Sequence, residues 1–237
     1  LNVILYGECG VGKTSLRNRW VDGVFTGDVA PTFGVDFNIK TLELDCGEEI
    51  ESVLEGSSRG TTTANAVFDS IGRDVRIDEN HACGGGIGAD TQSSKLAPYA
   101  RVEVKINVYD TSGKAAYRTV NGAYLLAFDA VLFVYDVSSV ATLDVRTKES
   151  NTIARKQAGT VMLLVGNKSD VPISDRQVGI QTGQDAATEF GIPFMEVSAK
   201  SGVNVKDAFM SVARSAVADR LSREAPKMNS IERRAGG

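Results

Sequence analysis

The chain of 237 residues is long enough for one sizeable core, and its composition, with 42% hydrophobic and 24% charged residues, is that of an ordinary globular protein. This excludes collagen-like, coiled-coil and wholly disordered chains, and the net charge of −4 gives no electrostatic argument for a nucleic acid partner. No apolar run approaches the roughly 20 residues that span a bilayer, and the first residues do not resemble a signal peptide. Three cysteines without a pairing or metal-ligand pattern favour a reducing compartment, so we expect a cytoplasmic protein.

Strand-like and helix-like segments alternate along most of the chain. The apolar residues 1–6 lead into a glycine loop and a helical segment, Lys13–Val21. Residues 101–108 alternate apolar and charged or polar side chains, which predicts a strand with one buried face. Two continuous apolar runs, Ala130–Asp136 and Val161–Asn167, predict parallel strands covered on both faces.

A further apolar series near the end follows helical spacing and predicts an amphipathic helix, with Val205, Ala208, Phe209, Val212, Ala213 and Ala216 on its buried face. Together these segments predict an α/β fold with a mostly parallel, doubly wound sheet. Sheets of this kind bind ligands at the carboxyl ends of their strands.

Residues 46–100 interrupt this alternation. They hold nine acidic and four basic residues, a triple glycine and clusters of serine and threonine, and this composition buries too little apolar surface to offset the ordering entropy. Only residues 66–77 carry enough apolar side chains for a short packed element. We predict a long, low-complexity acidic insertion, which is either a solvated loop, an acidic surface for a basic partner, or the product of a retained intron.

The strongest motif is GECGVGKT, residues 7–14, which lies between an apolar strand and a helix. It matches the pattern G-x-x-x-x-G-K-[ST], in which small residues let successive backbone N–H groups face phosphate oxygens. Lys13 is expected to reach the β- and γ-phosphates, and the Thr14 hydroxyl to bind Mg²⁺. The motif therefore predicts a nucleoside triphosphate site.

Two later segments indicate which base is bound. Asn167-Lys168-Ser169-Asp170 directly follows a predicted strand, and a carboxylate at Asp170 can accept both N1–H and N2–H₂ of guanine, a donor pair that adenine lacks. Asn167 and Lys168 would brace the loop and the base. Ser198-Ala199-Lys200 follows the predicted strand at 194–197 and fits a third loop whose backbone groups bond the guanine O6.

These motifs together resemble the Ras superfamily of small GTPases, and the details are most similar to the Rab family, over nearly all of the chain outside 46–100. Residues 32–37 resemble the first switch segment, where Thr32 would bind Mg²⁺ and sense the γ-phosphate. Residues 110–113 resemble the second, with Asp110 holding Mg²⁺ through water and Gly113 meeting the γ-phosphate. Phe25 occupies the position where the family places an aromatic ring against the guanine.

The resemblance implies a P-loop small-GTPase fold with one antiparallel strand, in which 46–100 is inserted into the hairpin between the second and third strands. The implied nucleotide-binding residues are Gly7, Glu8, Cys9, Gly10, Val11, Gly12, Lys13, Thr14, Ser15, Phe25, Thr32, Gly113, Asn167, Lys168, Asp170, Ser198, Ala199 and Lys200. The implied Mg²⁺ ligands are Thr14, Thr32 and Asp110, and the implied catalytic residues are Lys13, Thr32, Gly113 and Lys114.

Position 114 departs from the family pattern. The family usually carries a glutamine after the second-switch glycine, and that glutamine orients the attacking water, whereas this chain has Lys114. Lysine offers only donors and cannot accept the proton of the water. Cys9 also replaces a smaller residue that is usual in the phosphate loop. We therefore expect GTP binding with slow hydrolysis, unless a partner supplies the missing groups.

The predicted function is a guanine-nucleotide switch in vesicle trafficking or signalling, formed by a domain over 1–221 and followed by a flexible tail over 222–237. We expect a monomer that meets effectors, exchange factors and GTPase-activating proteins through its switch segments. The tail has no cysteine, whereas Rab proteins are anchored by C-terminal prenylated cysteines, so attachment to endomembranes is left open. A GTP-loaded scaffold that does not hydrolyse is the alternative; a P-loop ATPase or kinase is disfavoured by Asp170.

Overall fold

The computed structural model describes residues 1–27, 29–45, 75–77, 101–113, 127–143 and 159–235, with the side chains of 75–77, 101–102 and 224–235 excepted. The chain forms two compact units, residues 1–40 with 106–216 and residues 41–105 with 217–237. The candidate site described below lies wholly within the first unit.

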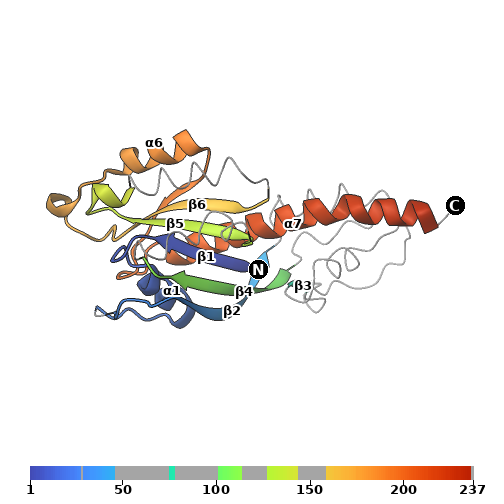
Figure 1. The fold of residues 1–237 in the computed structure, drawn as a ribbon, viewed down its shortest axis with the longest axis horizontal. Helices are drawn as coiled ribbons and strands as arrows, with labels where there is room; N and C mark the ends of the chain where they lie inside the picture. Colours follow the sequence, from blue (N-terminus) through green and yellow to red (C-terminus); the bar gives the residue numbers. More distant parts are fainter. Residues whose placement is uncertain (28, 46–74, 78–100, 114–126, 144–158, 236–237) are drawn as a thin grey trace, which may run out of the picture. The chain divides into compact units, whose positions relative to one another are not determined.

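The strands form one mixed sheet in the order β2-β4-β1-β5-β6-β7, with β3 paired to β4 (Figure 1). Their bounds are β1 Asn2–Gly7, β2 Val35–Asp45, β3 Val75–Ile77, β4 Arg101–Thr111, β5 Ala130–Asp136, β6 Val161–Asn167 and β7 Phe194–Glu196. The pairs β4–β1, β1–β5, β5–β6 and β6–β7 are parallel, and β3–β4 is antiparallel. The predicted α/β fold with a mostly parallel sheet is therefore confirmed.

Three α-helices and one short 3₁₀ helix accompany the strands within the described part of the chain. Their bounds are α1 Lys13–Asp22, η3 Ile173–Asp175, α6 Ile180–Phe190 and α7 Val205–Ala235. The backbone of 222–235, predicted as a tail, is the helical end of α7, although Pro226, a poor helix former, lies within it. The flexibility of this segment stays a prediction.

Buried apolar side chains cover both faces of the central strands. On one face, Phe133 and Tyr135 of β5 pack in a cluster with Leu164 of β6 and Ala187 of α6. Because neighbouring residues of a strand point to opposite faces, the buried residues Leu5, Leu132 and Leu163 lie on the other face. The apolar residues predicted for the last helix are all at most 2% exposed in α7.

The predicted insertion falls largely outside the described residues. Strand β2 ends at Asp45 and β4 begins at Arg101, at the two predicted boundaries of the insertion. Between them the structure describes only β3, which lies inside the segment 66–77 that the sequence marks as able to pack. The irregular character of the remainder stays a prediction. None of the helices in the described ranges is long and apolar enough to cross a membrane.

Candidate functional site

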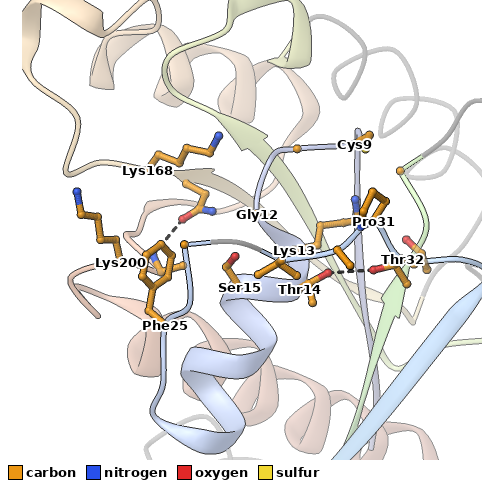
Figure 2. A pocket seen from close by; sticks show the side chains of 18 of the residues that line it. Cys9, Gly12, Lys13, Thr14, Ser15, Phe25, Pro31, Thr32, Lys168 and Lys200 are labelled. Carbon is orange, nitrogen blue, oxygen red and sulfur yellow. Dashed lines mark hydrogen bonds between the residues drawn. The ribbon is translucent and has the colours of Figure 1, made fainter.

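A cavity of about 430 Å³ lies at the segments that follow β1, β4, β6 and β7. These segments leave the carboxyl ends of mutually parallel strands, where α/β sheets bind ligands. Figure 2 shows Phe25, Lys168 and Lys200 at one end of the cavity and Cys9, Pro31 and Thr32 at the other. Of the predicted nucleotide-binding residues, those that line it are Cys9, Gly10, Gly12, Lys13, Thr14, Ser15, Phe25, Thr32, Gly113, Asn167, Lys168, Asp170, Ala199 and Lys200.

The other predicted residues take different places. Four of them do not line the cavity but form hydrogen bonds, described below, with residues that do: Gly7, Glu8, Val11 and Ser198. Asp110 is completely buried and touches the lining residues Thr14 and Thr32. Lys114 lies outside the described residues, and its role stays a prediction.

The phosphate-loop lysine is held inside the loop. The Lys13 ammonium donates to the backbone carbonyls of Gly7, at 2.9 Å, and Glu8, at 2.8 Å, and the residue is only 6% exposed. Gly12 has a positive φ of 92°, and a Cβ there would collide with the Asn167 amide. The glycine therefore allows both the turn of the loop and its close approach to the segment after β6.

Three oxygen-bearing side chains from distant segments converge beside Lys13. The hydroxyls of Thr14 and Thr32, joined by a dashed line in Figure 2, are within hydrogen-bond distance of each other at 3.0 Å, and both donate to Oδ2 of Asp110, at 2.5 and 3.1 Å. The second carboxylate oxygen of Asp110 is buried and has no hydrogen-bond partner among the described residues. Hydroxyl and carboxylate oxygens are the ligands that Mg²⁺ prefers, and the unpaired oxygen leaves coordinating capacity, so the residues fit this ion.

Asn167 joins the phosphate loop to the last loop of the site. Its amide nitrogen donates to the Val11 carbonyl at 2.8 Å, and its amide oxygen accepts from the Ala199 N–H at 3.1 Å. The side chain is buried, with 1% of the residue exposed. The residue therefore connects the phosphate loop and the last loop, whereas its predicted support of the base stays a prediction.

The carboxylate of Asp170 is oriented by the same last loop. The Ser198 hydroxyl donates to its Oδ1 at 2.5 Å, and the Lys200 ammonium lies 3.9 Å from its Oδ2. Lys168 forms an ion pair of 2.5 Å with Asp136, at the carboxyl end of β5. The structure thus brings Asn167, Asp170 and Ser198 together around one end of the cavity.

Gly113 packs against the phosphate loop. A Cβ at this position would collide with the backbone of Glu8 and Cys9, so only glycine permits this approach between the end of β4 and the loop after β1. The Cys9 residue itself is exposed and its thiol is free. The predicted γ-phosphate contacts therefore come from two segments that are in direct contact.

Several residues of the site belong to no sequence motif, and the sequence analysis did not predict them. Residues 27 and 29–31 line the cavity ahead of Thr32. Arg19 donates to the backbone carbonyls of Ala199 and Lys200, at 2.8 and 2.7 Å, and thereby holds the last loop against α1. Arg17 pairs with Asp36 of β2. None of these contacts has a sequence signal, because the partners are far apart in the chain and the acceptors of Arg19 are backbone atoms.

The fold and this arrangement define a P-loop nucleotide-binding protein, and the comparisons with known proteins identify its family. The Ras family model matches residues 2–56 and 80–218, so the chain belongs to the Ras family. The match omits 57–79, a narrower range than the predicted insertion.

Within this family the chain is similar to Rab and Ypt proteins. It is 30% identical to the Ras-related protein RAB1BV of Beta vulgaris, over 90% of this chain and 74% of that protein. It is also 30% identical to the GTP-binding protein ypt2 of Schizosaccharomyces pombe, over 90% and 80% of the two chains. Its identity to the Ras-related protein Rab-8A of Rattus norvegicus is 28%, over 90% and 76%. The chain is therefore a Rab-like member of the Ras family, as the sequence motifs predict.

Proposed function

We propose that this chain is a Rab-like guanine-nucleotide switch that binds GTP and GDP with Mg²⁺ and hydrolyses GTP slowly. The observation that carries the proposal is the single cavity that joins a buried lysine, a cluster of three oxygen-bearing side chains and the oriented carboxylate of Asp170. These are the groups needed for phosphates, a divalent cation and a guanine base, respectively.

The phosphates would lie along residues 7–15, with Lys13 facing the β- and γ-phosphates and Gly113 offering its N–H to the γ-phosphate. Thr14, Thr32 and Asp110 would hold Mg²⁺, which supplies positive charge to the phosphate oxygens. Because Thr32 belongs to the first switch segment and Gly113 to the second, loss of the γ-phosphate would release both segments together.

The guanine would lie at the other end of the cavity. Asp170 would accept its two N–H donors, and the Phe25 ring would lie against the base. Asn167 and Ser198 support this end through their contacts with the neighbouring loops. Lys168, Ala199 and Lys200 complete the lining.

The slow hydrolysis follows from residue chemistry at two positions. Lys114 has three donors and no acceptor, so it cannot hold the attacking water as the usual glutamine does. Cys9 places a larger side chain at the phosphate loop, on the segment whose backbone meets Gly113. Both features lower the rate of the chemical step and leave the binding groups intact.

Single-turnover hydrolysis of preloaded GTP tests this part of the proposal. We expect Lys114→Gln to raise the rate at least about tenfold, because it restores a group that can orient the water. The control is Lys105→Gln, which makes the same change at an exposed residue of β4 and should leave the rate within about twofold of the original. A wild-type rate equal to or above that of Lys114→Gln contradicts slow hydrolysis.

Protein partners would bind to the switch segments. Phe33, Val35 and Phe37 are exposed by 74%, 50% and 56%, which gives the first switch an apolar surface suited to effectors, exchange factors and GTPase-activating proteins. The corresponding surface at 114–119 lies outside the described residues. From its resemblance to the Rab family, the chain would act as a monomer in vesicle trafficking or signalling, in the cytoplasm or at the cytosolic face of endomembranes.

The second candidate is a GTP-loaded binding module without turnover. Lys114 and Cys9 favour this module as much as they favour a slow switch. In the same assay this candidate predicts no phosphate release above the buffer rate in the wild-type chain. A slow but measurable release supports the switch instead.

A further inference from the structure

Helix α1 carries a buried cation one turn after the proposed Mg²⁺ ligand Thr14. Arg17 is 9% exposed, and its guanidinium forms an ion pair with Oδ2 of Asp36, near the start of β2. The same Nη1 atom lies 3.8 Å from Oδ2 of Asp110. Its Nε and Nη2 atoms donate to the side-chain oxygen of Asn18, at 3.2 and 3.0 Å.

The guanidinium of Arg17 keeps its proton in any protein environment, so the buried charge must be balanced by its neighbours. The side chain of Asp36 is 59% exposed, and water screens much of its attraction. The side chain of Asp110 is completely buried, and its charge is screened far less. The positive charge of Arg17 is therefore balanced in part by the Asp110 carboxylate, the same group that accepts hydrogen bonds from the two threonine hydroxyls.

We propose that Arg17 is a positioning residue that shares the charge of Asp110 and thereby weakens Mg²⁺ binding at the nucleotide site. This inference rests on the proposed function, because it concerns the Mg²⁺ complex of the bound nucleotide. A divalent cation beside Asp110 would meet the repulsion of the guanidinium and a partly neutralised carboxylate. Since this ion would join the phosphates to Thr14, Thr32 and Asp110, the chain releases its nucleotide at higher free Mg²⁺ than a chain without this charge.

The test is the release of a fluorescent, non-hydrolysable N-methylanthraniloyl GTP analogue from the full chain, whose γ-phosphate keeps the first switch segment in place, measured against free Mg²⁺ set by a chelator buffer. The midpoint is the Mg²⁺ concentration at which release is half-suppressed. We expect Arg17→Gln to lower this midpoint at least about threefold, the effect of one weakly screened charge. Arg17→Lys keeps the charge and should return the midpoint toward the wild-type value. Lys206→Gln removes a positive charge from an exposed residue that does not line the cavity, and should leave the midpoint within about twofold.

Equal midpoints for wild type and a folded Arg17→Gln overturn the inference, and so does a lowered midpoint that Arg17→Lys fails to restore. If Arg17→Gln does not fold, Asp36→Asn replaces it. Among the described residues, this variant leaves Arg17 with Asp110 as its only carboxylate partner, so the midpoint should rise, and an unchanged midpoint overturns the inference. Absence of nucleotide binding by the wild-type chain in Mg²⁺ overturns the proposed function itself, and this inference with it.

Discussion

The side-chain amide of Asn167 makes two buried hydrogen bonds that hold the phosphate loop and the last loop of the site together. Replacement by alanine would leave the Val11 carbonyl and the Ala199 N–H without these partners. Each unsatisfied buried group costs about 1–3 kcal/mol. We therefore expect Asn167→Ala to lower the free energy of unfolding by about 2–4 kcal/mol and to speed nucleotide release, as measured by denaturant titration and fluorescent nucleotide chase.

Asn107 provides a matched control for this substitution. Its side-chain amide bonds Asn2 on the neighbouring strand at 2.9 Å, and it does not line the cavity. Asn107→Ala should lower stability by about 1 kcal/mol without a change in release. Equal release from the two variants would mean that Asn167 does not brace the site.

Single residues also mark the limit of what the sequence predicts. Asn167 and Asp170 were predicted because they belong to one short motif at the end of a strand. The contact among Arg17, Asp36 and Asp110 joins three segments that no local pattern relates. Such contacts are set by tertiary packing and become visible only in the folded chain.

At the level of elements, helix α6 fits onto the sheet through a glycine. A Cβ at Gly183 would lie 2.5 Å from the Tyr135 hydroxyl oxygen and 2.6 Å from the Phe194 ring. That hydroxyl is buried and has no hydrogen-bond partner among the described residues. Its burial, together with the nearby Glu196 carboxylate, raises the pKa of Tyr135 well above its usual value. The helix position therefore depends on close packing rather than on polar contacts.

We expect Gly183→Ala to lower the free energy of unfolding by about 1–3 kcal/mol, although alanine raises helix propensity by about 1 kcal/mol. Denaturant titration measures the change, and the exposed neighbour variant Gln184→Ala should stay within about 0.5 kcal/mol of wild type. Because the nearest obstacle is the Tyr135 hydroxyl, adding Tyr135→Phe should recover part of the loss. A Gly183→Ala chain as stable as wild type would contradict this account of the packing.

The same packing explains why α6 was not predicted. Its buried positions are Gly183 and Ala187, which give no strong apolar signal. Strands β5 and β6 were predicted with their bounds, because residues buried on both faces form continuous apolar runs. The last helix was predicted from a different signal, because its apolar side chains repeat with helical spacing.

For the whole molecule, we propose one GTPase domain over 1–221 that is interrupted at 46–100 and followed by 222–237. The fold class was predictable because alternating strands and helices admit few topologies. The strands on either side of the insertion end and begin at its predicted boundaries, but its role was not predictable, because low-complexity sequence carries no periodic pattern. The family model matches residues on both sides and omits only 57–79 of the predicted insertion.

The central claim is that the cavity holds a guanine nucleotide whose γ-phosphate is removed slowly. The most direct test is to purify the full chain in Mg²⁺, denature it, and identify the released nucleotide by chromatography. The account predicts about one guanine nucleotide per chain, with GTP in excess over GDP. Release of adenine nucleotide, or of none, would contradict the assignment of the site, and release of GDP alone would contradict slow hydrolysis.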